Sequence, residues 1–531
     1  MKIKYFLKLW LLLVFLTGCS RVKPTPTLAP FTTNSLPEIN PVGSNFEIVD
    51  CSTLENQQPD QANRPPDQDN ENDSTLCGYL TVPEERRLSD GPKIKIGVTV
   101  IKSSSQTRQQ DPLVLIGGGS YLGGGRYFGF PGMYDEMVLD RDIIMFDVRG
   151  MGHSQPAYSC PEYSELTDKM TSENISMAQW ESGYIGASQA CRDLVEGAGA
   201  NLSTYTSSAV AADMEDLRQA LGYSQWNVYA RAYGTRIALI LMRDYPQSLR
   251  SVVLDSVWPL QVAPLAEQAI NAEQALGALF RYCVEDEQCN QYYPLLKDYF
   301  YEDLEALNAQ PITVHTANLN SGALLDIVVD GNRLLDFVLS MISSSRMEQL
   351  SEVPRMIYQL HDGKTEVISQ LLGQSTGDNR FNGGIEQLIL CNDEARFSSF
   401  EAVTTASVIV DIRIQKYFEI ISEANWQACE AWKTGTSPAC ENIPVTSDIS
   451  ALLLAGDLNW RIPSSWATLA AQTLSHSYTV EFAGVGQALS SSRNLSECSN
   501  AIVKAFLTDP SVQPDLKCAS AKPHFVWITL R

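Results

Sequence analysis

The sequence is poor in basic residues for its length. Its 531 residues include 39 Lys and Arg against 62 Asp and Glu, which gives a net charge of −23 at pH 7. Binding to the phosphate backbone of a nucleic acid needs clustered basic side chains, so this balance argues against a nucleic-acid partner. Charged residues make up only 19% of the chain and hydrophobic residues 44%, which excludes a disordered protein and allows a large buried core.

The sequence patterns of metal and nucleotide sites are also missing. No two cysteines have the C-x2-C or C-x4-C spacing of a zinc site, and no histidine lies near enough to complete one. The glycine-rich run at 117–125 lacks the Gly-Lys-Ser/Thr ending of a phosphate loop and the G-x-G-x-x-G spacing of a dinucleotide site. We therefore expect neither a metal nor a cofactor.

The first residues indicate export. Lys2, Lys4 and Lys8 precede an apolar run at 9–16, which is the charged start and hydrophobic middle of a secretory signal. Eight apolar residues are too few to span a bilayer. The run ends in Leu-Thr-Gly before Cys19, which resembles the bacterial lipobox, where the cysteine is acylated and becomes the new N-terminus.

Residues 1–18 are thus predicted to be a lipoprotein signal peptide, and the alternative is an ordinary signal peptide with a chance cysteine at position 19. Acyl chains on Cys19 would anchor the protein to the surface of the bacterial cell membrane, outside the cytoplasm. Residues 19–45 are rich in Pro, Thr and Ser, a composition that stays extended and is predicted to form a tether.

Cysteine usage agrees with export, because the twelve cysteines of a chain outside the reducing cytosol are expected to pair. With Cys19 acylated, Cys391, Cys429 and Cys440 have no near partner, so one of these three is expected to be free or to pair outside the chain. Proximity in the sequence predicts four disulfides: Cys51–Cys77, Cys160–Cys191, Cys283–Cys289 and Cys498–Cys518.

Short apolar runs alternate with helical patterns from residue 95 to residue 260. This order predicts an α/β fold with a mostly parallel sheet and helices on both faces. Ligands of such sheets bind beyond the carboxyl ends of the strands. The expected strands are 96–100, 113–116, 143–146, 226–229 and 252–254, and the expected helices are 207–221 and 234–245.

Residues 263–445 interrupt this alternation, because their patterns are mostly helical. The alternation resumes with expected strands at 451–455 and 478–482 and expected helices at 464–474 and 496–507. We therefore predict a first part of the core at 46–262, an inserted helical lid at 263–445 and a second part of the core at 446–531. The helices expected in the lid include 265–283, 295–307 and 332–343.

Several motifs carry a family resemblance. They are the segments 111–119 (DPLVLIGGG), 141–154 (RDIIMFDVRGMGHS), 216–229 (DLRQALGYSQWNVY), 233–236 (YGTR) and 253–255 (VLD). Together they resemble the α/β-hydrolases of the prolyl aminopeptidase and tripeptidyl aminopeptidase (TAP-like) family. The resemblance implies the α/β-hydrolase fold, with a serine nucleophile on a strand-to-helix elbow, an Asp after a later strand and a His near the end.

Each triad position of this family holds an inert residue here. Ala232 stands at the nucleophile position in 230–236 (ARAYGTR), Asn459 at the acid position in 456–463 (GDLNWRIP), and Gln487 at the base position in 484–487 (GVGQ). A methyl group cannot attack a carbonyl, and neither amide can replace the charge or the proton transfer of its counterpart. The resemblance therefore predicts a catalytically silent chain from a family of serine hydrolases.

The family's oxyanion loop maps onto Gly118, Gly119 and Ser120, together with the backbone N–H of Tyr233. In this chain the loop has lost the family's proline and gained Tyr121. The oxyanion site is thus predicted to be altered as well as the triad.

Arg231, Tyr121 and Trp460 are candidate contacts for a peptide or small-molecule ligand near the elbow, although aromatic residues here could equally be packing residues. An active hydrolase with an unrecognised nucleophile stays an alternative, and so does a scaffold without a pocket. Asp457 is a displaced candidate acid, but a shift of two residues moves a carboxylate by roughly 6 to 7 Å along a strand. Thr235, a spare hydroxyl, has no recognisable base beside it in the sequence.

Overall fold

The structure is a computed structural model. It describes residues 45–55, 75–103, 105–117, 140–173, 175–318, 322–343, 347–375, 383–434, 437–487, 496–520 and 525–529. The expected signal peptide, Cys19 and nearly all of the expected tether lie outside these ranges. None of the helices in these ranges combines the length and the hydrophobicity needed to cross a membrane.

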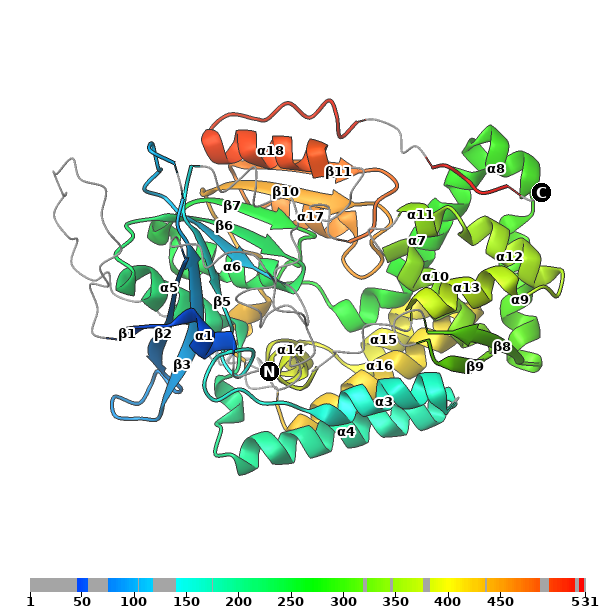
Figure 1. Cartoon of the computed structure of the whole chain (residues 1–531), viewed down its shortest axis with the longest axis horizontal. Coiled ribbons are helices and arrows are strands. Elements are labelled where there is room, and N and C mark those ends of the chain that lie inside the picture. The colour runs from blue at the N-terminus through cyan, green and yellow to red at the C-terminus, as the bar shows by residue number, and fades with distance from the viewer. Residues whose placement is uncertain are drawn as a thin grey trace, which may run out of the picture.

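A nine-stranded sheet forms the centre of the described core (Figure 1). Its order is β1-β2-β3-β5-β4-β6-β7-β10-β11, and the strands from β5 to β11 are parallel. The predicted mostly parallel sheet is confirmed, but its antiparallel edge of β1, β2 and β3 includes two strands that were not predicted. The strands are β1 (Phe46–Val49), β2 (Thr75–Pro83), β3 (Lys93–Ile101), β4 (Leu113–Ile116), β5 (Ile143–Phe146), β6 (Trp226–Arg231), β7 (Leu249–Asp255), β10 (Ser450–Gly456) and β11 (Ser477–Phe482).

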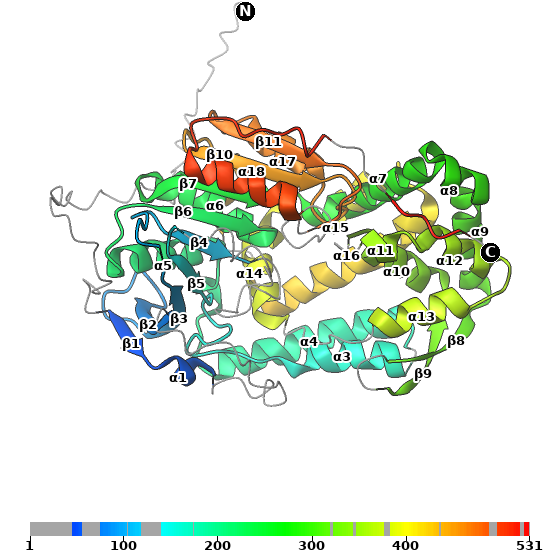
Figure 2. The same cartoon turned by 45° about the horizontal axis from the view of Figure 1, so that its top comes forward.

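Helices cover both faces of the sheet, which is why the inner strands β4 and β5 are apolar at every position. Val114 and Val228 pack on one face against α5 (Ser207–Ala220), α6 (Tyr233–Asp244) and α17 (Ser464–Ala471). Leu115 and Tyr229, one residue further along their strands, pack on the opposite face against α18 (Ser496–Thr508). Figure 2 shows α18 on this opposite side. Because successive side chains of a strand point to opposite faces, both sets are buried.

The helices between β7 and β10 form the other half of the molecule, and we call this segment the lid (Figure 1). A two-stranded hairpin of β8 and β9 inside it was not predicted. The lid also receives α3 (Pro161–Ser172) and α4 (Met177–Gly197) from the first part of the core, because α4 packs along α16. The lid elements are α7 (Pro264–Glu285), α8 (Glu287–Tyr292), α9 (Leu296–Ala309), β8 (Ile312–Ala317), β9 (Leu324–Val329), α10 (Gly331–Ser343), α11 (Met347–Leu350), α12 (Val353–His361), α13 (Glu366–Ser375), α14 (Gly384–Glu394), α15 (Phe400–Ser407) and α16 (Ile412–Trp432).

Disulfides close the segments that sequence proximity indicated. The structure contains the bonds Cys51–Cys77, Cys160–Cys191, Cys283–Cys289 and Cys498–Cys518. A fifth bond, Cys391–Cys429, joins α14 to α16. Cys440 is disulfide-bonded as well, so no described cysteine is the expected free thiol.

Helix α14 lies between the sheet and the rest of the lid. Ile385 and Leu388 belong to the same hydrophobic cluster as the central strands. Gly384 packs against the Cys160–Cys191 disulfide. A Cβ on Gly384 would lie 2.2 Å from the sulfur of Cys191. Burial also raises the pKa of Glu386, in the first turn of α14, to about 8. This carboxyl is therefore an unfavourable place for a charge.

We expect Glu386→Gln to stabilise the protein at alkaline pH. A carboxyl whose pKa is higher in the folded than in the unfolded protein costs stability as pH rises from the unfolded value, 4.5, to the folded value, about 8. The variant removes this cost, so its gain in unfolding free energy should be roughly 3 to 5 kcal/mol at pH 9 and under about 1 kcal/mol at pH 5. Urea denaturation of both proteins at the two pH values measures the gain.

The exposed Glu401 of α15 offers a matched control, because Glu401→Gln removes the same charge from the surface of the lid. Its effect should be within about 0.5 kcal/mol at either pH. A gain from Glu386→Gln that is equal at pH 5 and pH 9 would contradict the assignment.

Candidate functional site

The turn from β6 to α6 keeps the shape of a nucleophile elbow. Ala232 occupies it with φ 51° and ψ −123°, a conformation that residues with a Cβ rarely adopt. Its N–H donates a hydrogen bond of 2.8 Å to the carbonyl oxygen of Asp255. Two residues on, a Cβ on Gly234 would lie 2.2 Å from the carbonyl oxygen of Gly117, so only glycine permits this approach of α6 to β4.

The side chain at the elbow is a methyl group in an apolar setting. Ala232 is 4% exposed and clusters with Val262, Ile462 and Trp466. The family's serine would present a hydroxyl from this point. The structure therefore combines the backbone of a nucleophile elbow with a side chain that has no nucleophilic atom.

Asn459, at the acid position after β10, forms hydrogen bonds to the segment after β7 and within the segment after β10. Its Nδ2 donates to the hydroxyl of Ser256 at 3.3 Å, and its Oδ1 accepts from the N–H of Ile462 at 3.1 Å. The Ser256 hydroxyl in turn donates to Asp255 at 3.2 Å. The donor of this amide joins the end of β10 to the end of β7, and its acceptor closes the turn at 459–462.

Gln487, at the base position after β11, lies on a segment that contacts the lid. Its N–H donates to the carbonyl oxygen of Ser343, the last residue of α10, at 3.0 Å. A Cβ on the preceding Gly486 would lie 2.5 Å from the carbonyl oxygen of Ile342. The three triad positions thus follow the carboxyl ends of β6, β10 and β11 at one edge of the sheet, as the resemblance implied.

The alternative acid and hydroxyl near the elbow are engaged elsewhere. Asp457 accepts from the hydroxyl of Tyr282 on α7 and, at 2.7 Å, from the N–H of Gly484. This carboxylate holds the lid to the core. Thr235 donates its hydroxyl to the carbonyl oxygen of Ala232 at 2.6 Å, which closes the first turn of α6.

The described histidines pair with acceptors rather than with hydroxyls. A catalytic base must reach the proton that it removes. Within the ranges that the structure describes, no histidine ring is hydrogen-bonded to a hydroxyl group. The ring contacts are His153 with Asp147 at 2.7 Å, His315 with Asp326 at 2.7 Å, His361 with Asp303 at 2.9 Å and His476 with the carbonyl oxygen of Asp448 at 2.8 Å.

A buried polar network lies directly behind the elbow. The hydroxyl of Tyr233 donates to Asp393 at 2.5 Å and accepts from Ser207 at 3.0 Å. The guanidinium of Arg236 lies 2.5 Å from the carboxylate of Glu394. Burial raises the pKa of Glu394 to about 7, although the charge of Arg236 opposes this shift. The YGTR motif therefore binds α6 to α14.

Asp393 and Glu394 were not predicted as partners of this motif. Their signal in the sequence is a pair of consecutive acids that follows the apolar run 388–391 after one residue, Asn392. An acid pair in a buried helix needs a buried cation or a hydrogen-bond donor, and Arg236 is such a cation. Only the tertiary fold shows that α14 supplies the acids that pair with Tyr233 and Arg236.

The expected oxyanion loop is only partly described. Gly118, Gly119, Ser120 and Tyr121 lie outside the described residues. The N–H of Tyr233 stands at the first position of α6, where a helix offers no intrahelical acceptor. This donor has the position that the resemblance implied, and its role at an oxyanion stays a prediction.

The candidate ligand contacts differ in their surroundings. Arg231 is the last residue of β6 and is buried beside the elbow. Trp460 is 4% exposed, donates its Nε1–H to the carbonyl oxygen of Leu339 at 3.0 Å and packs edge-on against Phe418 of the lid. Trp460 thus joins the core to the lid, and its contact with a ligand stays a prediction.

Comparisons with known proteins agree with this geometry. A family model described as "alpha/beta hydrolase fold" matches residues 111–489. The tripeptidyl aminopeptidase of Streptomyces lividans is 28% identical over 193 residues, 34% of this chain and 35% of that protein. The serine protease Hip1 of Mycobacterium tuberculosis is 25% identical over 226 residues, 40% of this chain and 42% of that protein.

A solved proline iminopeptidase of Mycobacterium smegmatis aligns with 82% of this chain and 98% of its own, at 13% identity and a TM-score of 0.35. The alignments span between 35% and 48% of the length of the curated relatives that the chain matches. The family model itself covers well over half of the chain, including the elbow and all three triad positions. The chain belongs to the α/β-hydrolase family.

Proposed function

We propose that this protein is a catalytically silent α/β-hydrolase homologue that is anchored by lipid to the outer side of the cell membrane and binds a peptide or a small molecule. The observation that carries the proposal is the pairing of a preserved elbow with Ala232 at its apex. Loss of the nucleophile alone leaves serine hydrolases with roughly 10³- to 10⁴-fold acceleration over water. Asn459 and Gln487 remove the acid and the base as well.

The competing function is an active hydrolase that uses another nucleophile. Among the described residues, Ser256 is the candidate nucleophile for this alternative, because its hydroxyl bonds to Asn459 and its backbone has φ 63°. Two observations oppose it. Ser256 is 0% exposed, so a substrate cannot reach it, and its hydroxyl is bonded to the carboxylate of Asp255 rather than to an imidazole.

The peptide-binding part of the proposal is supported by the relatives and by the fold. Two of the relatives named above are peptidases by name. A chain that keeps their core and loses its nucleophile can still present a recognition surface at the carboxyl edge of the sheet. Arg231, Tyr121 and Trp460 remain the residues proposed to contact the ligand there.

We expect no turnover of aminoacyl p-nitroanilides or p-nitrophenyl esters by the purified protein. Without a nucleophile and base, the rate should equal that of a mock preparation from cells that lack the gene. Continuous absorbance assays with saturating substrate measure this. The triple variant Ala232→Ser, Asn459→Asp, Gln487→His should be at least as active as the unaltered chain.

Turnover by the unaltered protein that persists through repurification would contradict catalytic silence. The variant Ser256→Ala then separates the two readings of such a result. Activity lost in Ser256→Ala would identify the competing nucleophile. Activity retained in it would place the nucleophile outside the residues described near the elbow.

The lipid anchor is proposed from the sequence of residues 1–19, with support from the five disulfides of the described chain. In a bacterial host fed radiolabelled palmitate, the full chain should carry label and fractionate with membranes. Cys19→Ala should lose both properties, because no acyl chains remain to hold it. Thr25→Ala, in the expected tether, is the matched control and should behave as the unaltered chain. Label or membrane association retained by Cys19→Ala would refute the anchor.

A further inference from the structure

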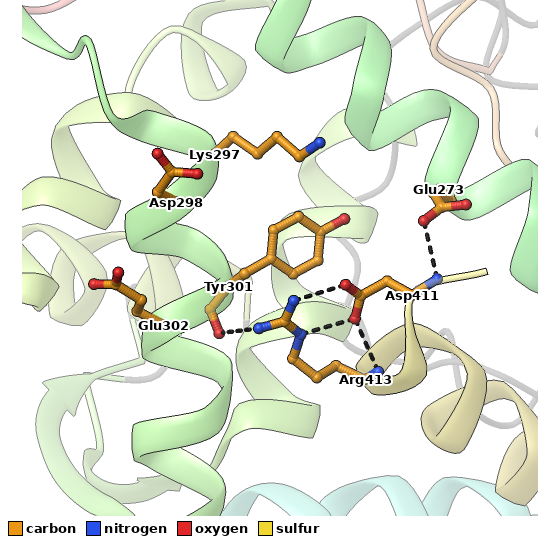
Figure 3. A pocket seen from close by; sticks show the side chains of 7 residues that line it. All are labelled: Glu273, Lys297, Asp298, Tyr301, Glu302, Asp411 and Arg413. Carbon is orange, nitrogen blue, oxygen red and sulfur yellow. Dashed lines mark hydrogen bonds and ion pairs between the residues drawn. The ribbon is translucent and has the colours of Figure 1, made fainter.

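The lid contains a cavity of about 320 Å³ that is built without any residue of the elbow. Its volume lies at the lower end of the range of small-molecule sites, roughly 300 to 1,000 Å³. Residues of α7, α9 and the start of α16 form its walls (Figure 3). They are Glu273, Lys297, Asp298, Tyr301, Glu302, Asp411 and Arg413.

One wall of the cavity is a tightly bonded ion pair of Asp411 and Arg413. Arg413 donates to both carboxylate oxygens of Asp411, at 2.7 and 2.6 Å, and its guanidinium stacks over the ring of Tyr301 with 4.4 Å to the ring centre. The N–H of Asp411 donates to Glu273 at 3.0 Å. These contacts fix the positions of the wall. Arg413 also donates to Glu305 at 2.9 Å, so its positive charge is shared between two carboxylates.

The hydroxyl of Tyr301 is directed into the cavity. Tyr301 is only 8% exposed, and its hydroxyl has no hydrogen-bond partner among the described residues. Figure 3 shows it between Lys297 on one side and Glu273 and Asp411 on the other. Burial and the negative charges of Asp411 and Glu273 raise the pKa of this hydroxyl, so it stays protonated and can both donate and accept.

Two opposite charges face the cavity without an ion pair. Glu273 on α7 and Lys297 on α9 form no salt bridge with any described residue, and Figure 3 shows both reaching toward the space beside Tyr301. Asp298 and Glu302 point to the other side of α9 in the same view. Both of these acids still line the cavity, but beside the Tyr301 hydroxyl the side-chain charges without an ion pair are one carboxylate, Glu273, and one ammonium group, Lys297.

This arrangement selects the chemistry of the ligand. A metal ion is disfavoured, because no group of three or more His, Cys, Asp or Glu is placed to hold one in the described parts of the chain. A simple anion would be repelled by Glu273, and a simple cation by Lys297. A molecule that carries both an ammonium and a carboxylate satisfies the two side chains together.

We propose that this cavity binds a small zwitterion, an amino acid or a dipeptide, with its ammonium group on Glu273, its carboxylate on Lys297 and a hydrogen bond to the hydroxyl of Tyr301. The site is separate from the elbow. The inference therefore goes beyond the proposed function and holds whether or not the chain is catalytic.

Isothermal titration of the purified protein tests the inference with four probes. L-leucine and L-leucyl-L-leucine carry both charges, L-leucinamide lacks the carboxylate and N-acetyl-L-leucine lacks the ammonium group. At least one of the first two should bind, and the last two should bind at least tenfold more weakly, because each loses a charge-assisted hydrogen bond. Two results would overturn the inference. One is that neither zwitterion binds at 10 mM, about the weakest affinity expected of such a small ligand. The other is that an analogue with a single charge binds as tightly as the zwitterions.

Two conservative variants locate the site. Glu273→Gln keeps the oxygen that accepts from Asp411, and Tyr301→Phe keeps the ring under Arg413, so both leave the wall of the cavity intact. Each should weaken zwitterion binding about tenfold or more. Glu285→Gln is the matched control, because it removes an exposed charge at the end of the same helix, α7. Equal affinity in all three variants would place binding elsewhere and overturn the inference.

Discussion

The hydrogen bond from the N–H of Ala232 to the carbonyl oxygen of Asp255 fixes the turn on which the arrangement of the site depends. A residue with a Cβ pays roughly 1 to 3 kcal/mol for such a conformation. The turn persists because its neighbours leave no alternative: Gly234 lies against the backbone of β4, and Thr235 closes the first turn of α6. The elbow is therefore a property of the packed sheet, and it survives in a chain whose elbow side chain has no nucleophilic atom.

The same turn connects the lid to the core. Tyr233 and Arg236, immediately after Ala232, bond to Asp393 and Glu394 on α14. Breaking one partner of a buried charged pair leaves an uncompensated charge, which is far more costly than the pair itself is stabilising. A movement of α14 away from α6 would break these bonds and leave buried charges unpaired. The lid therefore cannot shift at α14 without disturbing α6. A second contact between lid and core joins Tyr282 of α7 to Asp457, which follows β10.

Local patterns predicted the elements whose burial is uniform. The runs at 113–116 and 143–146 coincide with β4 and β5, because a strand covered on both faces is apolar at every residue. The strands β1 and β2 and the lid hairpin were missed. Residues such as His315 and Asp326 alternate with apolar ones there, and half-exposed strands of six residues give little signal. The triad replacements were visible because the motifs around them are intact, whereas the packing of Trp460 and the cavity around Tyr301 depend on helices far apart in the sequence.

The fifth disulfide, Cys391–Cys429, lies close in the sequence to the buried network behind the elbow. Cys391 and Cys429 are 38 residues apart and join α14 to α16, so the pair was not predicted from proximity. Closing a loop of this length removes unfolded-state entropy worth about 3 to 4 kcal/mol. Cys391 lies two residues before Asp393, the partner of Tyr233. In a reducing compartment this bond would open, and the constraint beside the elbow network would be lost.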